Sequence, residues 1–259
     1  MTSADILKKC NEYIQDISRA PALSCVEYYF IAWLKRFFPV EKLYPRTIVS
    51  YAEAERLIME HNYENIKKID RVQDIAEQYG IVEHEKKQHA GETPQTDELV
   101  LLRVTDHYFR GRQRPWRQDH YVALVGVSRD TYYIVNTYPL EIRELTKGDE
   151  RWIQGDSLVF HYLGEKQVED SVGFLKAETL QTQNLTLEKF RDALLLYRVS
   201  LRRLMQCKPG DALRQLIDYT EKIFYSCALM ARKNPQDRVT AETWRKEIVA
   251  KEQEFREGL

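Results

Sequence analysis

The spacing of apolar and polar residues divides the chain into three stretches. Residues 1 to about 80 carry apolar side chains at helical intervals, which predicts four amphipathic helices. Ser3 is expected to cap the first, which runs to about Ser18, while the second begins near Cys25, the third begins at Ser50 and the fourth ends at Gly80.

The middle stretch, from residue 81 to about 175, changes to short segments rich in Val, Ile, Leu and Tyr, which is typical of strands. We expect six strands, at Ile81–Glu85, Glu98–Thr105, His120–Val127, Thr131–Asn136, Glu141–Leu145 and Ser157–Leu163. Residues 186–258 predict three amphipathic helices, with breaks at Lys208-Pro209-Gly210 and Asn234-Pro235. Helices followed by an antiparallel sheet indicate an α+β fold over residues 1–176, with a C-terminal helical region at 177–259.

Composition narrows the class of protein. The chain has 259 residues, with 39 Lys and Arg against 40 Asp and Glu, so a globally basic nucleic-acid binder is not expected. No apolar run reaches the ~20 residues of a membrane span, and the first residues lack the basic and apolar regions of a signal peptide. The four cysteines show neither CxxC nor metal-ligand spacing. We therefore expect a cytoplasmic protein with reduced thiols, no metal and no membrane or nucleic-acid partner.

One cysteine differs from the other three in its local sequence. Ser24 and Glu27 have the S-x-x-E spacing of a capping box, which places Cys25 at the first position of a helix. The positive end of the helix dipole favours a thiolate there, and the free N–H groups of the first turn suit an oxyanion. A small buried apolar residue is the alternative interpretation of Cys25. Cys10 and Cys227 lie within helical stretches and Cys207 at a helix end, where the dipole disfavours a thiolate.

A cysteine nucleophile needs a base, and the base needs a partner that orients it. His120 begins the clearest strand, and Asn136 ends the next one. If a three-residue loop joins the strands, Val122 pairs with Asn136, and His120 and Asn136 share a face. If Arg129-Asp130 forms a two-residue loop without a bulge, Asn136 lies on the opposite face. A histidine and an asparagine that merely satisfy backbone groups are the alternative.

These residues resemble those of a known family. A cysteine at a helix start, an apolar strand, an arginine- and aromatic-rich loop and the pattern His120-Tyr-Val-Ala-Leu-Val-Gly-Val…Tyr-Ile-Val-Asn136 are similar to the papain-like peptidases that process bacteriocin leaders. The chain more closely resembles their biosynthetic relatives, the butirosin-biosynthesis acyltransferase family, over residues 20–165. The resemblance implies a papain-like cysteine-peptidase core, with Cys25 as nucleophile, His120 as general base and acid, and Asn136 as the orienting residue.

The sequence departs from the family pattern at two places. The usual Asp-Pro is replaced by Asn136-Thr-Tyr-Pro139, and no glutamine lies in the segment just before Cys25, since Gln15 is too far back. That glutamine helps to form the oxyanion hole in the peptidases. A thioester is easier to attack than an amide, and backbone N–H groups alone can serve it, so these departures favour thioester chemistry over peptide cleavage.

The resemblance implies an acyltransferase of bacterial secondary metabolism, such as antibiotic biosynthesis of the polyketide or nonribosomal peptide kind. It would take an acyl chain from the phosphopantetheine arm of an acyl-carrier or peptidyl-carrier protein and pass it to an amine or alcohol, with no cofactor of its own. The loop before His120 carries residues that suit an acidic carrier or an acyl channel, although a solvated basic loop is the alternative. These candidate substrate-binding residues are Tyr108, Arg110, Arg112, Arg114, Trp116 and Arg117.

Other functions remain open at this point. A Dieckmann-type cyclase would use the same three residues but release the chain as a ring. A cysteine peptidase or thioesterase would use water. A non-catalytic scaffold within a biosynthetic cluster would need none of the three. For the C-terminal helices, the sequence leaves a lid, an acceptor platform or a homodimer interface as alternatives.

Overall fold

The computed structural model describes residues 2–39, 43–44, 47–61, 72, 76, 79–86, 92–104, 120–137, 139–146, 157–164 and 185–258. The described residues form six helices and one six-stranded antiparallel sheet, so the α+β class is confirmed. Contacts divide the chain into two compact units. Unit 1 comprises residues 1–38 and 71–168, and unit 2 comprises residues 39–70 and 169–259.

Unit 1 contains the sheet and two helices, α1 (Ser3–Ser18) and α2 (Cys25–Leu34). The strands lie in the order β1-β6-β2-β3-β4-β5, and every neighbouring pair is antiparallel. Their bounds are β1 Ile81–Lys86, β2 Glu98–Val104, β3 His120–Ser128, β4 Thr131–Thr137, β5 Leu140–Thr146 and β6 Ser157–Tyr162.

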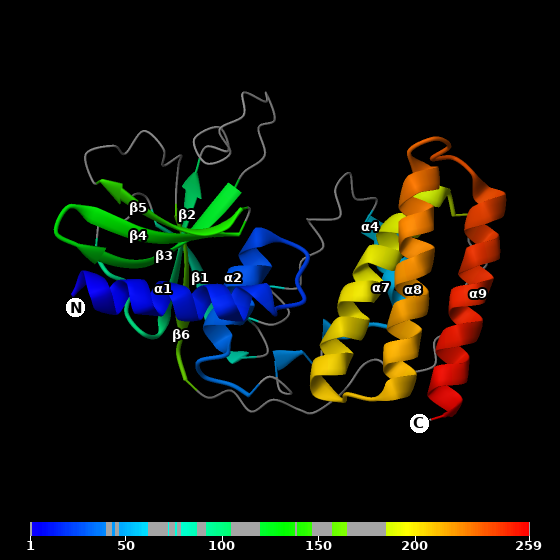
Figure 1. Cartoon of the computed structure of the whole chain (residues 1–259), viewed down its shortest axis with the longest axis horizontal. Coiled ribbons are helices and arrows are strands. Elements are labelled where there is room, and N and C mark those ends of the chain that lie inside the picture. The colour runs from blue at the N-terminus through cyan, green and yellow to red at the C-terminus, as the bar shows by residue number, and fades with distance from the viewer. Residues whose placement is uncertain are drawn as a thin grey trace. The chain divides into compact units, whose positions relative to one another are not determined.

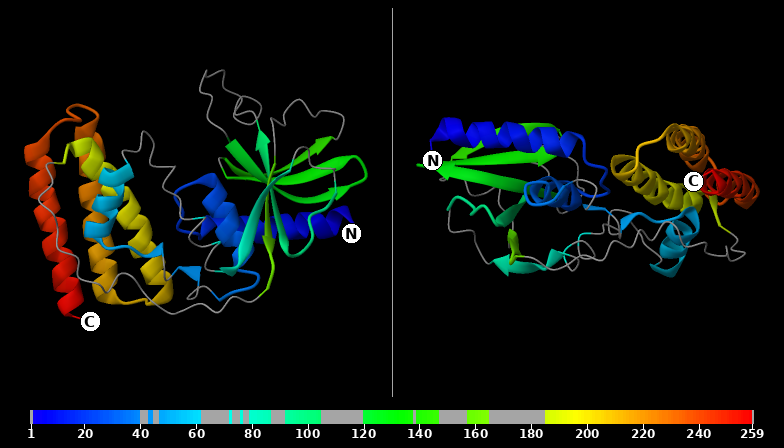
Figure 2. Two further views of the ribbon diagram at one scale, coloured as in Figure 1. Left: turned by 180° about the vertical axis from the view of Figure 1, so that it is seen from behind. Right: turned by 90° about the horizontal axis from the view of Figure 1, so that it is seen from below.

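Both helices of unit 1 pack on the same face of the sheet (Figures 1 and 2). Gly126 lets α1 approach, because a Cβ there would lie 2.9 Å from Cγ2 of Ile6. Phe30 of α2 contacts Phe160 of β6, with ring centroids 5.0 Å apart. The other face carries an apolar cluster of nine buried residues drawn from five strands. Both faces are therefore buried, which explains why the strands are nearly continuous in apolar residues rather than alternating.

The hairpin formed by β3 and β4 has an irregular register. Ser128 pairs with Thr131 across a two-residue loop, in which Arg129 has a φ of 51°. The pairing then shifts by one residue between Leu124 and Gly126, leaving Val125 as an extra residue on β3. Such a β-bulge reverses the face to which all later residues point relative to an unbroken ladder.

Unit 2 contains four helices: α4 (Tyr51–His61), α7 (Leu187–Cys207), α8 (Asp211–Ala231) and α9 (Arg238–Glu257). Helix α7 packs against α4, α8 and α9, and α4 also contacts α9. Aromatic contacts join α4 to α7, where the ring of Tyr51 lies 5.7 Å from that of Tyr197 and 6.1 Å from that of Phe190. The apolar face of α4 is thus covered by α7, although 125 residues separate the end of α4 from the start of α7.

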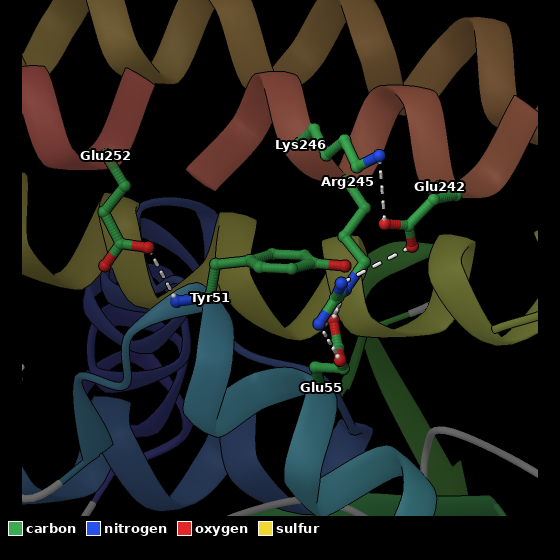
Figure 3. A network of polar contacts seen from close by, with 6 residues as sticks. All are labelled: Tyr51, Glu55, Glu242, Arg245, Lys246 and Glu252. Carbon is green, nitrogen blue, oxygen red and sulfur yellow. Dashed lines mark hydrogen bonds and ion pairs between the residues drawn. The ribbon is translucent and has the colours of Figure 1, made fainter. Parts of the chain in front are cut away.

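Buried polar contacts also fix α4 to α9 (Figure 3). The Arg245 guanidinium donates two hydrogen bonds to the Glu55 carboxylate, at 2.6 and 2.9 Å. The Glu252 carboxylate accepts a hydrogen bond from the backbone N–H of Tyr51 at 3.0 Å, at the start of α4. Glu55, Arg245 and Glu252 are all buried, so these contacts satisfy groups that would otherwise be costly to remove from water.

The expected elements agree closely with the observed ones. All six strands are present within two residues of their expected bounds, and the three C-terminal helices break at the expected positions. One detail was wrong: Thr2, rather than Ser3, caps α1, because its hydroxyl accepts the N–H of Asp5. Most of the fourth expected helix, before Gly80, lies outside the described residues.

The boundaries of the two units differ from the expected division at residues 176 and 177. Residues 39–70, including α4, belong to unit 2 because the apolar and ionic side chains of α4 are buried by α7 and α9. Sequence order had grouped them with the N-terminal helices.

Among the described residues, no helix combines the length and the apolarity that crossing a bilayer requires.

Candidate functional site

Cys25 is the first residue of α2, as expected. Ser24 is the N-cap, and its hydroxyl accepts the N–H of Glu27 at 3.0 Å. The Cys25 side chain is half-buried. Its thiol therefore lies at the positive end of the α2 dipole, where negative charge is stabilised by ~0.3–1 kcal/mol or more when partly buried.

Glu27 acts differently from the partner in a capping box. Its carboxylate accepts the backbone N–H of Leu23 at 2.6 Å, two residues before Cys25, and the side chain is fully buried. The carboxylate thus holds the entering chain against the first turn. The S-x-x-E spacing identified the right residues, while the backbone group that Glu27 satisfies was found only in the structure.

His120 and Asn136 form a buried pair. His120 Nε2 lies 2.7 Å from Asn136 Oδ1, and the two residues are 5% and 0% exposed. An amide oxygen only accepts hydrogen bonds, so Nε2 is the donor and Nδ1 is the basic nitrogen of the neutral ring. This is the tautomer that a general base requires if a nucleophile approaches Nδ1.

The bulge at Val125 creates this pair. The loop has two residues, which by itself would set Asn136 opposite Ala123, on the face away from His120. The extra residue shifts the pairing, so Ala123 lies opposite Val135 and the next position sets Val122 opposite Asn136. His120 and Asn136 then become diagonal neighbours on one face. The two-residue loop considered from the sequence is the observed one, and the bulge restores the shared face that the sequence had linked to a three-residue loop.

Helix α2 begins beside the end of the sheet at which β3 starts (Figure 1), and α2 packs against β3. Tyr29, one turn after Cys25, lies beside Thr137, the residue that follows Asn136. Burial raises the pKa of Tyr29 well above its ordinary value, so its hydroxyl stays protonated. The start of α2 therefore lies near the strand ends that carry His120 and Asn136, but the alternation of β3 sets the His120 side chain on the face of Val122 and Leu124, opposite α2.

The other cysteines lack these features. Burial raises the pKa of Cys10 and of Cys227 to about 12, so both thiols stay protonated at neutral pH. Cys207 is half-buried like Cys25, but it is the last residue of α7. The negative end of that helix dipole disfavours a thiolate.

The remaining expected site residues lie outside the described residues. These are Tyr108, Arg110, Arg112, Arg114, Trp116 and Arg117. Among the residues that the structure describes, no group of three or more His, Cys, Asp or Glu side chains is arranged to hold a metal ion. The absence of a cofactor stays a prediction.

Sequence reasoning missed two contributors to this region, Val125 and Tyr29. Val125 looks like any other strand residue, and only the adjacent Gly126 hints at an irregularity. Tyr29 was overlooked because its role depends on a residue more than 100 positions away.

Comparisons of the chain with profiles of known protein families, with curated proteins and with solved structures found no match.

Proposed function

We propose that this chain is a cysteine-dependent acyltransferase with a papain-like core, in which Cys25, His120 and Asn136 act together. The observation that carries the proposal is the buried hydrogen bond of 2.7 Å between His120 Nε2 and Asn136 Oδ1. It fixes the tautomer in which Nδ1 accepts a proton. Further support comes from a helix that starts with a half-buried cysteine and packs on the strand bearing the histidine.

The proposed reaction has two halves. His120 Nδ1 takes the proton of the Cys25 thiol, and Sγ attacks the carbonyl carbon of an acyl thioester. The C–S bond to the pantetheine arm breaks, and the leaving thiolate receives the proton from His120. An amine or alcohol then attacks the acyl-Cys25 thioester and gives its proton to His120. The Cys25 sulfur leaves and recovers that proton, so the enzyme returns to its first state.

Backbone N–H groups at the start of α2 are suited to the oxyanion of both halves. The first four N–H groups of a helix have no partner within the helix. The Ser24 hydroxyl occupies that of Glu27. The N–H of Cys25 lies at the reacting sulfur itself, which is the position that acyl-transfer enzymes use for one oxyanion donor. A carrier protein is the partner that thioester chemistry implies, together with a small amine or alcohol, and the arginines in the loop before His120 suit an acidic carrier surface.

The test is covalent acylation measured by intact-protein mass spectrometry. We expect the wild-type chain, mixed with short-chain acyl thioesters of pantetheine, to gain one acyl group that is absent in Cys25→Ala. Cys207→Ala is the matched control, because Cys207 is also half-buried but lies at the C-terminal end of its helix. This control should acylate like the wild type. An adduct that persists in Cys25→Ala, or no adduct at all, contradicts the proposal.

A second measurement separates the catalytic proposal from a scaffold. At pH 6, iodoacetamide should alkylate Cys25 faster than Cys207, since only the first lies at a helix N-terminus. Equal rates at the two thiols, without turnover, favour a scaffold. Adding a series of amines to the acylated protein then separates three outcomes. Transfer gives an amide of the added amine. A peptidase or thioesterase releases the free acid by reaction with water, and a cyclase releases the acyl chain as a ring.

A further inference from the structure

A pocket lies in unit 1, at the other end of α2 from Cys25. Its cavity volume is about 260 Å³, and residues of α1, α2, β2 and β3 line it together with the segment at 94–96. Trp33 of its lining is eight residues after Cys25 on α2, which corresponds to ~12 Å along the helix. This pocket is therefore separate from the proposed catalytic residues.

The buried part of the lining is apolar and aromatic. It consists of Tyr13, Trp33, Leu99 and Leu124, each less than 5% exposed. The indole Nε1–H of Trp33 is buried and has no hydrogen-bond partner among the described residues. Buried donors are nearly always satisfied in folded proteins, so an occupant of the pocket is one way to complete this lining. The volume suits a ligand smaller than a typical drug molecule.

The rim of the pocket carries both signs of charge. The cations are Lys9 and Arg36, and the anions are Glu12 and Glu98. The Arg36 guanidinium lies over the Tyr13 ring, 4.9 Å from its centroid, which holds it at the rim. Within the described part of the chain, Lys9, Glu12 and Arg36 make no ion pair. Glu98 instead accepts the backbone N–H of Gln95 at 2.9 Å, and its other carboxylate oxygen lies 3.6 Å from His161 Nδ1.

We propose that this pocket binds a small apolar α-amino acid as its zwitterion. The ligand carboxylate would pair with Arg36, which offers two parallel donors, and the ammonium would pair with Glu12. The side chain would lie against Trp33 and Leu99. A rim with both signs of charge favours a zwitterion, which pairs with one cation and one anion, over a simple anion or a simple amine, which pairs with only one of them.

The pocket also touches the bulge of β3. Val125, the extra residue that sets the pairing of His120 with Asn136, lines the pocket together with Leu124. A bound ligand would thus contact the irregularity on which the histidine–asparagine pair depends. Binding itself does not require the proposed acyltransferase activity.

The test is calorimetric titration of the whole chain with three matched compounds. L-Phenylalanine carries both charges, 3-phenylpropanoate lacks the ammonium, and 2-phenylethylamine lacks the carboxylate. We expect L-phenylalanine to bind at least about tenfold more tightly than either truncated compound, because each of those loses a charge-assisted hydrogen bond. Equal affinities for the three compounds, or no binding of L-phenylalanine at millimolar concentration, overturn the proposal.

Two rim residues are exposed, so variants at these positions should fold like the wild type. Arg36→Gln and Glu12→Gln should each weaken L-phenylalanine binding about tenfold. Arg214→Gln, an exposed arginine of unit 2 that pairs with Asp211, is the control and should leave the affinity unchanged. Circular dichroism confirms that each variant is folded. Unchanged affinity in both rim variants places the ligand elsewhere and overturns the assignment.

Discussion

The two units of the chain differ in the pairs of polar side chains that they bury. Unit 2 buries charges in pairs: Arg245 with Glu55, and Glu252 with Arg256 and the backbone of Tyr51. Unit 1 buries a neutral pair, His120 with Asn136, at the end of its sheet. The partners in unit 2 come from helices held side by side, whereas those in unit 1 come from adjacent strands.

This difference separates a structural use of buried polarity from a chemical one. An arginine and a carboxylate joined by two charge-assisted hydrogen bonds are held in one arrangement, so they fix geometry. A histidine oriented by an amide keeps one ring nitrogen free of that bond, and this nitrogen can accept a proton. Unit 1 therefore holds the group suited to proton transfer, while unit 2 holds the groups suited to fixing α4 on α9.

The largest expected effect concerns the histidine of the neutral pair. We expect His120→Gln to lower the rate of Cys25 acylation by about 10²–10⁴-fold, the usual contribution of a general base. His161→Gln is the control, since His161 is a half-buried histidine of β6 in the same sheet. Acylation should be followed by mass spectrometry over time. If both variants acylate like the wild type, His120 is not the base.

Asn136 tests whether orientation matters within that pair. Asn136→Ala should slow acylation because nothing then fixes Nε2, and Asn136→Asp should restore most of the rate, since a carboxylate also accepts from Nε2–H. The pH dependence of acylation separates orientation from a packing defect. Asn136→Asp should raise the apparent pKa of His120, because a negative charge favours the imidazolium. An unchanged pH profile contradicts the orienting role.

The next largest effect is expected when a charged pair in unit 2 is broken. Arg245→Met leaves the Glu55 carboxylate buried without its partner and should lower the free energy of unfolding by ~3–5 kcal/mol. The double variant Glu55→Leu/Arg245→Met should recover most of this loss, because no charge then stays buried. Urea denaturation followed by circular dichroism measures both. Arg214→Ala, which breaks an exposed pair, should cost less than ~1 kcal/mol.

Helix caps offer a smaller and more direct comparison of the two units. Ser24 caps α2 in unit 1, and Ser50 accepts the N–H of Glu53 at 3.1 Å at the start of α4 in unit 2. Replacing either serine by alanine should cost ~1 kcal/mol of stability. Only Ser24→Ala should also slow Cys25 acylation, because it disturbs the turn around the proposed nucleophile. Equal acylation rates in the two variants argue against a catalytic role for the first turn of α2.

The smallest expected effect is a pH dependence that originates in unit 2. Burial raises the pKa of Glu252 above its ordinary value of 4.5, and it does the same for Glu55. The folded chain thus binds more protons than the unfolded chain above about pH 4.5. The stability contribution of these groups falls as the pH rises through their raised pKa values. Glu252→Gln should flatten this part of the profile, whereas Glu254→Gln, an exposed change, should not.

Much of the fold followed from local sequence. Strand positions were predictable because β-branched and aromatic runs end at turn residues, and the C-terminal helices because Pro and Gly break them. The assignment of α4 to unit 2 was not predictable, since Tyr51 and Glu55 are buried by residues nearly 140 or more positions further along the chain. Hydrophobic spacing reports that a helix has a buried face, but not which distant element covers it.

The sequence by itself determined which residue types are available and where the elements begin. Cys25 at the first turn of α2 and His120 at the start of β3 follow from capping and strand signals that act over a few residues. Only the tertiary structure decided that Asn136 meets His120. That contact depends on the one-residue bulge at Val125, and a register is set by the energy of the whole ladder and of both buried faces rather than by any local pattern.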